Sequence, residues 1–363
     1  MIRILQVVNI MDRAGLETML MNYYRNINRD VIQFDFLVHR EEKGAYDDEI
    51  EMLGGKIYHA PRLYPQNYVL YFNYMKQFFD EHKEYNIVHS HIDTMSAFPL
   101  LAAKWNSVPI RIAHSHTSKL DIDAKLLIKY LAKIVVPYVA NRCLACGEKA
   151  GLFLFGKRKY KIIHNAINLS NYSYNAQTRK EMRQDLGVDD KFVIGHVGRY
   201  SYIKNQVYLL EILKEILKTN ERAVLLLVGK GDDEHKLRTE VIKSGLEKQV
   251  FFLIDRSDVE RIYQAFDIFV MPSLFEGLPL VGIEAQANGL TCLFSKNISD
   301  EVLCTNTAEY LPLEASVWVD RVLAHDSSRN PKAKEELKKR GYDIVEEAIK
   351  LQQYYLEQDT NKI

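Results

Sequence analysis

Short apolar segments alternate with longer segments in which apolar residues recur at helical spacing along most of the chain. The short segments are bounded by glycine, proline or polar residues and are typical of strands buried on both faces. Because strands that alternate with helices pair in parallel, the pattern predicts α/β sheets covered on both sides. The first series of predicted strands is Ile2–Asn9, Phe34–Val38, Lys56–His59, Ile87–His91, Pro109–His114 and Arg142–Cys146, with a helix at Leu16–Ile27.

The pattern restarts near Ile162–Asn168, where a polar stretch follows. A second series of predicted strands is Phe192–Val197, Ala223–Val228, Val250–Leu253, Ile268–Met271 and Thr291–Phe294. Because 363 residues are many for one core, we expect two Rossmann-like domains with a cleft between them. The expected domains are residues 1–168 and 169–341, with the C-terminal helix (342–363) returning to the first.

Composition is that of a globular protein, with 47% hydrophobic and 26% charged residues and a net charge of zero. Residues 1–168 carry 22 Lys and Arg against 17 Asp and Glu, and the remainder 26 against 31. This asymmetry indicates that the first domain meets something anionic, but we expect no nucleic acid. The sequence begins with a predicted core strand rather than a signal peptide, and it has no bilayer-spanning run.

Four cysteines are too few for a disulfide framework. Cys143 and Cys146 form a CxxC within an apolar run, which favours a buried strand over a redox or metal site. We therefore expect a cytoplasmic protein with no bound metal and no cofactor.

The most informative stretch runs from Pro272 to Glu284 and contains two glutamates eight positions apart. Gly277 and Pro279 break the chain after Glu276, which places that residue on a loop at the end of a strand. A helix is expected from Val281, and its free N–H groups would suit an anion. The backbone N–H groups of this stretch can therefore bind a phosphate, and its two carboxylates can accept hydrogen bonds from sugar hydroxyls.

Two cations follow the first strand of the second domain. Arg199 can grip a phosphate with two hydrogen bonds, and Lys204 supplies a point charge. Ligands of such sheets bind beyond the carboxyl ends of strands, where both residues are expected. The alternative is that they are ordinary solvated loop residues, and the Gly229–Gly231 turn after the next strand is explained equally well as a helix entry.

In the first domain, Gly15 stands where a strand turns into a helix, so a ligand could approach its backbone. An ordinary helix-entry turn explains this glycine nearly as well. His114 and His116 alternate with hydroxyl residues at a later strand end and could hydrogen-bond a substrate. They lack a neighbouring carboxylate or thiolate, which argues against a metal. His89 and His91 repeat the pattern at an earlier strand, and we interpret them as supporting or core residues.

Lys125, Lys129 and Lys133 recur every four residues in an otherwise apolar helix. Such a stripe suits an anionic membrane surface. An ordinary solvated face, with lysine stems covering apolar surface, explains it equally well.

Together these motifs resemble the retaining GT-B glycosyltransferases of bacterial capsule and exopolysaccharide synthesis, and most closely the EpsF-like exopolysaccharide transferases. The resemblance covers most of the chain, and its specific part is the two-glutamate stretch. It is carried by Gly15-Leu-Glu-Thr-Met-Leu-Met-Asn, Ala113-His-Ser-His, Cys146-Gly-Glu, Gly198-Arg with Lys204-Asn205, and Met271-Pro-Ser through Glu284.

The resemblance implies a nucleotide-sugar donor, most commonly a UDP-sugar, and a lipid-linked or saccharide acceptor at the inner membrane face. It implies that Arg199 and Lys204 hold the diphosphate, Glu276 contacts the sugar and Glu284 the ribose. Backbone groups of Gly15, Gly277, Leu278, Leu280 and Val281 would assist at the phosphates. His114 or His116 would lie near the sugar, and the sequence leaves open which one.

Two departures from the family pattern affect details. Ala14 stands where the family usually has a second glycine before Gly15, and Asp255 stands where it tends to have glycine near the base.

Competing interpretations are a nucleotide-sugar epimerase or a phosphorylase on the same fold, and an inactive sugar-nucleotide-binding partner protein. The four charged residues Arg199, Lys204, Glu276 and Glu284 argue against a decayed site.

Overall fold

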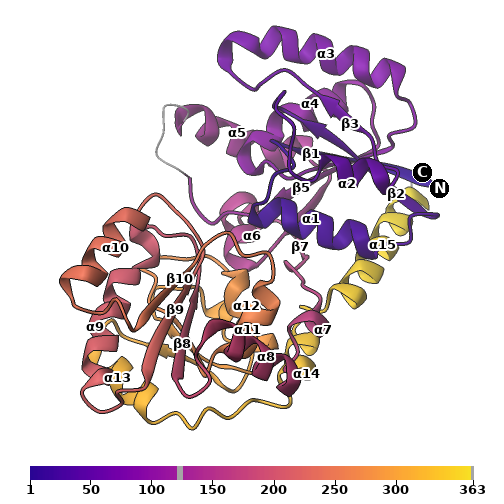
Figure 1. Cartoon of the computed structure of the whole chain (residues 1–363). Helices are drawn as coiled ribbons and strands as arrows, with labels where there is room; N and C mark the ends of the chain where they lie inside the picture. Colours follow the sequence, from indigo (N-terminus) through magenta and orange to yellow (C-terminus); the bar gives the residue numbers. More distant parts are fainter. Residues whose placement is uncertain (121–125, 361–363) are drawn as a thin grey trace. The chain divides into compact units, whose positions relative to one another are not determined.

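A computed structural model describes residues 1–120 and 126–360, which form two compact units (Figure 1). Unit 1 comprises Met1–Ile167 and Asp343–Ile363, and unit 2 comprises Asn168–Tyr342. Each unit is built on its own parallel sheet.

The sheet of unit 1 has seven strands in the order β3-β2-β1-β4-β5-β6-β7. The order reverses between β1 and β4, so the loops that leave these two strands diverge to opposite faces at their carboxyl ends. The strands are β1 Ile2–Val8, β2 Ile32–Val38, β3 Ile57–His59, β4 Ile87–Ser90, β5 Ile110–Ser115, β6 Arg142–Ala145 and β7 Lys161–Ile162.

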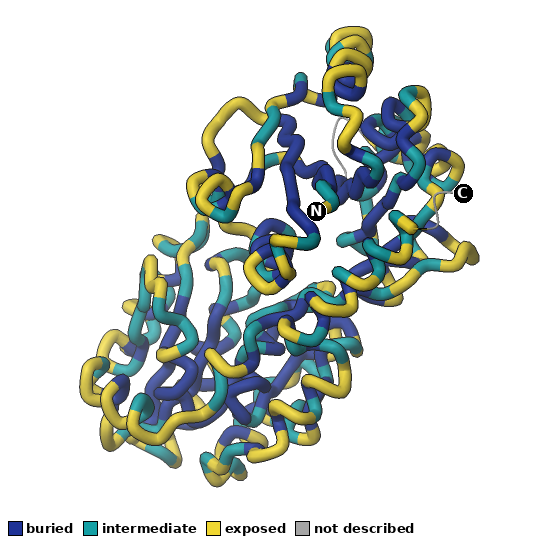
Figure 2. The backbone as a smooth tube through the Cα atoms, turned by 90° about the vertical axis from the view of Figure 1, so that its right-hand side faces the viewer, coloured by how far each residue is buried: buried dark blue, intermediate teal, exposed yellow. Residues whose placement is uncertain are grey.

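Apolar helix faces cover both sides of this sheet. On one side, α1, α2 and α15 pack over β1 and β2, and on the other lie α3, α4, α5 and α6. The central strands β1, β2, β4 and β5 are accordingly among the most buried parts of the unit (Figure 2). The helices are α1 Gly15–Asn26, α2 Asp47–Met52, α3 Tyr68–Glu81, α4 Ala97–Trp105, α5 Leu126–Val139, α6 Glu148–Phe155 and α15 Ile344–Thr360. Short 3₁₀ turns span Pro65–Asn67 and Asp93–Ser96.

The sheet of unit 2 has six strands in the order β10-β9-β8-β11-β12-β13, with its reversal between β8 and β11. Leucine-rich β9 is buried along its whole length, as expected for a parallel strand covered on both faces. The strands are β8 Phe192–Val197, β9 Ala223–Val228, β10 Val250–Leu253, β11 Ile268–Met271, β12 Thr291–Ser295 and β13 Ala308–Leu311.

The two ends of α8 (Ala176–Leu186) follow local capping rules. The Asn175 side chain accepts a hydrogen bond from the Thr178 N–H at 2.9 Å and begins α8, while Gly187, with φ of 66°, ends it. The helices are α7 Leu169–Tyr172, α8 Ala176–Leu186, α9 Gln206–Leu217, α10 Glu234–Lys243, α11 Val259–Ala265, α12 Leu280–Ala287, α13 Ala315–Leu323 and α14 Ala333–Lys339. Further 3₁₀ turns span Tyr202–Lys204 and Asp300–Val302.

The predicted strands are confirmed to within two residues at each end, and those of β8, β9, β10 and β11 agree at both ends. The prediction missed β13, whose sequence Ala-Glu-Tyr-Leu is too short and too polar to stand out. It also placed His91 and His114 at the last positions of their strands. The structure ends β4 at Ser90 and β5 at Ser115, so that His91 and His116 lie just beyond the sheet.

Candidate active site

Two loops of unit 2 meet where the strand order reverses between β8 and β11. The loop after β8 ends in the turn Tyr202–Lys204, and the loop after β11 leads into α12. The Leu274 N–H donates to the Ile203 carbonyl at 2.8 Å, and the Asn205 amide donates to the Pro272 carbonyl at 3.2 Å. Asn205 has a φ of 56°, a left-handed conformation that asparagine tolerates better than most residues. These bonds hold the two loops together.

An ion pair between Lys204 and Glu276 joins the same two loops. Lys204 Nζ lies 2.6 Å from Glu276 Oε1, and each side chain is 17% exposed. The lysine stem passes beside Gly198, where a Cβ would lie 3.5 Å from it. Glu276 forms a parallel bridge with Ile298, and its carbonyl accepts from the Ser299 N–H at 3.2 Å. Backbone contacts therefore hold the loops that carry both charged residues.

Arg199 lies in the loop after β8, but its side chain pairs with a different carboxylate. Its Nη2 lies 2.6 Å from Asp232 Oδ2, and the two side chains are 67% and 87% exposed. Exposed pairs of this kind contribute about 0–1 kcal/mol, so Arg199 can be drawn to a stronger anion at little cost.

The glycine turn after β9 is explained by packing. A Cβ on Gly231 would lie 2.2 Å from the Tyr200 carbonyl oxygen, and one on Gly229 would lie 2.2 Å from the Gly198 carbonyl oxygen. Only glycine lets the loops after β8 and β9 approach this closely. The Gly229–Gly231 pattern thus supports the loop that carries Arg199.

Glu284 lies on the first turns of α12 and points to a tyrosine. The Tyr263 hydroxyl donates to Glu284 Oε2 at 2.9 Å. Burial raises the pKa of the Glu284 carboxyl, although hydrogen bonds from Tyr263 and Tyr172 work against this shift. Sequence reasoning missed Tyr263, because a tyrosine in an apolar helix is usually part of the core.

The N-terminus of α12 offers backbone donors next to the Lys204–Glu276 pair. Pro279 precedes the helix and provides no side-chain cap, so the first N–H groups are open to a ligand. Gly277 would carry a Cβ into empty space, whereas a Cβ on Gly282 would lie 2.9 Å from the Phe294 ring. Gly277 therefore leaves room at the surface, and Gly282 lets the helix pack on the sheet.

The two departures from the family pattern have different structural outcomes. Asp255 follows β10 with a left-handed φ of 51° and forms an ion pair with Lys230. The backbone there is one that favours glycine, and aspartate is among the residues that tolerate it. Ala14 is extended, with φ of −130°, so a glycine is not needed at this position.

A buried histidine and glutamine hold the base of the loop after β8, and sequence reasoning missed both. His196 Nδ1 lies 2.9 Å from the Val270 carbonyl oxygen, and its Nε2 lies 3.3 Å from Gln206 Nε2. Gln206 also donates to the Arg199 carbonyl at 2.9 Å. A polar residue within an apolar strand was the available signal for His196.

Four histidines of unit 1 gather at the carboxyl ends of β4 and β5. His89 Nε2 lies 3.2 Å from His114 Nδ1, and His91 Nδ1 lies 3.0 Å from His116 Nε2. Burial lowers the pKa of all four imidazoles, that of His116 to about 3. Nitrogen atoms of His89, His91 and His114 lie within 4.8 Å of one another, close enough to share a metal ion. The sequence argument against a metal considered carboxylates and thiolates and did not foresee this cluster.

Residues near the cluster fix the turns around it. Asp93 has a φ of 48°, and its Oδ1 accepts from the N–H groups of His116 at 2.6 Å and Thr117 at 3.2 Å. Gly15 begins α1, and a Cβ there would meet no atom within 4 Å. Its backbone is therefore open to a ligand at the carboxyl end of β1.

Cys143 and Cys146 belong to β6 and the residue just after it, as the strand interpretation requires. All four cysteines lie in the described part of the chain and none forms a disulfide. Burial raises the pKa of the Cys143 thiol to about 11, which leaves it a poor nucleophile.

The helix α5 exposes apolar residues in addition to the two described lysines of the predicted stripe. Lys129 and Lys133 are half-buried, and Lys133 Nζ lies 4.0 Å from the centre of the Phe153 ring; Lys125 lies outside the described residues. Among helices of the described ranges, none is long and apolar enough to cross a bilayer. The exposed apolar side chains of α5 are Leu126, Leu127, Tyr130, Leu131, Ile134, Val135 and Tyr138.

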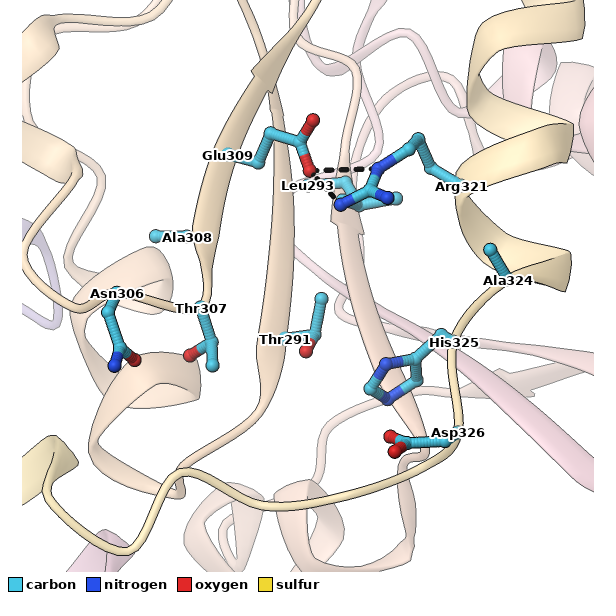
Figure 3. Close-up of a pocket in the computed structure, with 10 residues that line it drawn as sticks. All are labelled: Thr291, Leu293, Asn306, Thr307, Ala308, Glu309, Arg321, Ala324, His325 and Asp326. Atoms are coloured by element: carbon cyan, nitrogen blue, oxygen red, sulfur yellow. Dashed lines mark hydrogen bonds and ion pairs between the residues drawn. The ribbon is translucent and has the colours of Figure 1, made fainter.

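A polar pocket of about 320 Å³ lies at the opposite edge of the unit 2 sheet (Figure 3). It is lined by the amino-terminal ends of β12 and β13, including Thr291 and Ala308, and by the end of α13. Glu309 and Arg321 form an ion pair across it. Because ligands of parallel sheets bind at the carboxyl ends of strands, this pocket is separate from the candidate site.

Comparison with known proteins gives a consistent result. The family described as glycosyl transferases group 1 matches residues 178–304. The chain is 33% identical to the putative glycosyltransferase EpsF of Bacillus subtilis, over 99% of this chain and 98% of EpsF. It is 27% identical to the UDP-Gal:alpha-D-GlcNAc-diphosphoundecaprenol alpha-1,3-galactosyltransferase of Escherichia coli, over 77% of each protein.

Among solved structures, Anabaena HepE in complex with UDP superimposes with a TM-score of 0.82. The two share 18% identity, and the match covers 98% of this chain and all of HepE. Such a likeness shows the fold, and the predicted GT-B architecture of two Rossmann-like sheets is confirmed.

Buried neutral histidines predict that acid destabilises the protein. Burial lowers the pKa of His39 and His196 to about 4, as it lowers those of the four clustered histidines. The unfolded chain takes up these protons near pH 6.5, so stability is retained above that pH and lost as the pH falls through it, by up to about 1.4 kcal/mol per group and pH unit. Five of these six histidines belong to unit 1, which should unfold first.

Scanning calorimetry between pH 7.5 and pH 5 checks this expectation. We expect Tm to fall, and His39→Gln to reduce the slope because one buried histidine is removed. His235→Gln, on an exposed part of α10, should keep the wild-type slope. A Tm that is constant or rises toward pH 5 contradicts the prediction.

Proposed function

The chain belongs to the group 1 glycosyltransferases, and we propose that it transfers a sugar from a UDP-sugar to a lipid-linked or saccharide acceptor, with retention at the anomeric carbon. The observation that carries this proposal is the ion pair of Lys204 and Glu276 at the switch point of unit 2. A phosphate would replace Glu276 as the partner of Lys204, and the Glu276 carboxylate could then accept hydrogen bonds from sugar hydroxyls.

The choice of UDP and of the acceptor rests on similar proteins. The name of the Escherichia coli relative gives UDP-Gal as donor and a diphosphoundecaprenol-linked acceptor, and HepE was solved with UDP. Resemblance to exopolysaccharide transferases supports a role in exopolysaccharide or capsule synthesis.

We assign the donor-binding roles within unit 2. Arg199 and Lys204 hold the diphosphate, helped by backbone groups of Gly277, Leu278, Leu280 and Val281 at the start of α12. Arg199 gives up only an exposed ion pair with Asp232 to do so. Glu276 binds the sugar. Glu284 takes the ribose hydroxyls, and its bond to Tyr263 keeps the carboxylate oriented.

Unit 1 serves the acceptor in this proposal, and it contributes the open backbone at Gly15 to the phosphates. His114 and His116 lie near the transferred sugar. These assignments follow the family pattern and the placement of the three residues at the carboxyl ends of β1 and β5.

The proposed mechanism is a front-face substitution. The bond between the anomeric carbon and the β-phosphate oxygen breaks, and a bond to the acceptor oxygen forms on the same face. The acceptor proton passes to the departing phosphate. Negative charge therefore grows on the diphosphate, where Arg199, Lys204 and the α12 N-terminus stabilise it without calling on a metal ion. Glu276 and Glu284 both bind the donor, so they do not form the nucleophile and acid pair of a glycosidase.

Loss of either donor-binding cation should slow turnover. Removal of one preorganised group that stabilises growing charge costs about 100- to 1000-fold in rate, and we expect this for Lys204→Ala and for Arg199→Ala. The assay follows UDP release from UDP-glucose, UDP-galactose and UDP-N-acetylglucosamine with added membrane lipid extract.

The matched control is Lys218→Ala, because this exposed lysine pairs with Glu215 on α9, away from the site. It should retain wild-type turnover. If Lys204→Ala and Arg199→Ala both turn over donor at near-normal rates, the assignment of the diphosphate site is wrong.

We also propose that α5 attaches the protein to the inner face of an anionic membrane. Its exposed apolar residues, among them Leu127 at 72% and Tyr138 at 68% exposure, would enter the acyl boundary. Lys129 and Lys133 flank them and would meet anionic head groups. Apolar exposure of this extent argues against an ordinary solvated face.

Flotation with vesicles of phosphatidylglycerol and phosphatidylcholine tests this attachment. We expect the wild type to float and Leu131→Glu/Ile134→Glu to stay at the bottom, because two carboxylates oppose both insertion and the surface charge. The control is Val345→Glu/Ile349→Glu, which changes similarly exposed apolar residues of α15. Absence of flotation, or dimerisation through α5 in solution, contradicts the proposal.

A further inference from the structure

A glutamine and a tyrosine connect the four histidines of unit 1 into one hydrogen-bond network. Gln6 lies in β1, opposite His89 of β4 in the sheet register, and Tyr355 comes from α15. Both side chains are buried. The two ends of the Gln6 amide start two separate chains of hydrogen bonds, one through His91 and one through Tyr355.

The first chain starts from the amide oxygen. Gln6 Oε1 lies 2.8 Å from His91 Nε2, and an amide oxygen can only accept, so His91 Nε2 carries the proton. In a neutral imidazole the other nitrogen then accepts. His91 Nδ1 therefore accepts from His116 Nε2 at 3.0 Å, and His116 Nδ1 is left with a lone pair.

The second chain starts from the amide nitrogen. Gln6 Nε2 donates to the Tyr355 hydroxyl at 3.3 Å, and the single proton of this hydroxyl goes to His89 Nδ1 at 2.6 Å. His89 Nε2 then carries a proton and donates to His114 Nδ1 at 3.2 Å. His114 Nε2 is left with an N–H group.

Both chains end on buried atoms that still need a hydrogen bond. His114 Nε2 and His116 Nδ1 have no hydrogen-bond partner within residues 1–120 and 126–360. The centres of the two rings are 4.1 Å apart. One ring offers a donor and the other an acceptor, because the chains leave opposite ends of one amide.

We infer that Gln6 and Tyr355 are positioning residues that make His114 a hydrogen-bond donor and His116 an acceptor toward a hydroxyl of the transferred sugar. A hydroxyl both accepts and donates, so it matches both imidazoles at once. A phosphate or carboxylate could bond only to His114, and an ammonium only to His116. This inference rests on the proposed function, and it gives the two histidines different roles.

A metal ion shared by His89, His91 and His114 is the competing use of these residues. His89 Nε2 already takes part in a hydrogen bond with His114, and His91 Nδ1 in one with His116. A metal would have to break both bonds. The burial that lowers the pKa of all four rings favours the neutral imidazoles on which the network depends.

Nitrogen NMR of the ligand-free, full-length protein labelled with ¹⁵N-histidine tests the network. The two chains of hydrogen bonds require the Nε2–H tautomer for all four histidines. Tyr355→Phe removes one hydroxyl, so His89 and His114 should become a mixture of tautomers while His91 and His116 stay unchanged. Gln6→Met should turn both histidine pairs, His89 with His114 and His91 with His116, into mixtures of tautomers. Tyr354→Phe removes a neighbouring hydroxyl of the same helix and should leave the spectrum as in the wild type.

Several outcomes overturn the inference. These are Nδ1–H tautomers in the wild type, an unchanged His114 signal in Tyr355→Phe, and histidine signals that shift when EDTA removes bound zinc. Assignment of the signals comes from His114→Asn and His116→Asn.

Kinetics separate a positioning role from a purely structural one. With the UDP-sugar that the wild type uses, Tyr355→Phe should lower kcat about 2- to 10-fold, the range that one lost hydrogen bond gives, with KM for UDP-sugar nearly unchanged. Equal loss in Tyr354→Phe, or a change only in Tm, contradicts the role. If no UDP-sugar is turned over even by the wild type, the proposed function fails, and the NMR result still decides whether the network exists.

Discussion

Within each unit, the carboxyl ends of parallel strands, at the point where the strand order reverses, determine where the candidate site residues of that unit lie. In unit 2 the loops after β8 and β11 carry Lys204 and Glu276. In unit 1 the residues at the ends of β1, β4 and β5 are Gly15 and the clustered histidines. Loops that leave neighbouring strands toward opposite faces open a crevice between them. In unit 2, the helix α12 starts at the carboxyl ends of the strands, and its first backbone N–H groups lie there.

Charge neutralisation follows from this geometry. Charged groups that converge without a ligand must be paired, because a buried unpaired charge is costly. Lys204 and Glu276 meet this requirement with each other, and Glu284 accepts a hydrogen bond from Tyr263. Arg199 is exposed, so its pair with Asp232 is not needed for this purpose. In the proposed function, Lys204 and Arg199 exchange their ion pairs for contacts with the diphosphate, whereas the bond from Tyr263 to Glu284 is kept. Unit 1 has buried neutral histidines instead, because burial lowers the pKa of their imidazoles.

Sequence patterns predicted the strands well because apolar runs bounded by turn residues have few alternative structures. They also singled out Lys204 and Glu276, because both lie in loops that follow predicted strands. The pairing of these two residues could not be predicted, because it depends on loop bonds such as that from Leu274 to Ile203. Gln6 and Tyr355 were missed for a related reason. They are 349 positions apart, and nothing in β1 indicates that α15 packs beside it. The exposed apolar face of α5 was also missed, because helical periodicity does not reveal which side of a helix faces solvent.

Calorimetric titration with UDP and UDP-glucose measures the central claim, that Lys204 and Glu276 exchange their ion pair for a nucleotide-sugar. The account predicts that Lys204→Gln weakens UDP binding at least about tenfold, which corresponds to about 1.4 kcal/mol. Glu276→Gln should bind UDP as tightly as the wild type or more tightly, because its lysine is already free, and should lose the extra affinity contributed by glucose. Equal UDP affinity in the wild type and Lys204→Gln would contradict the account.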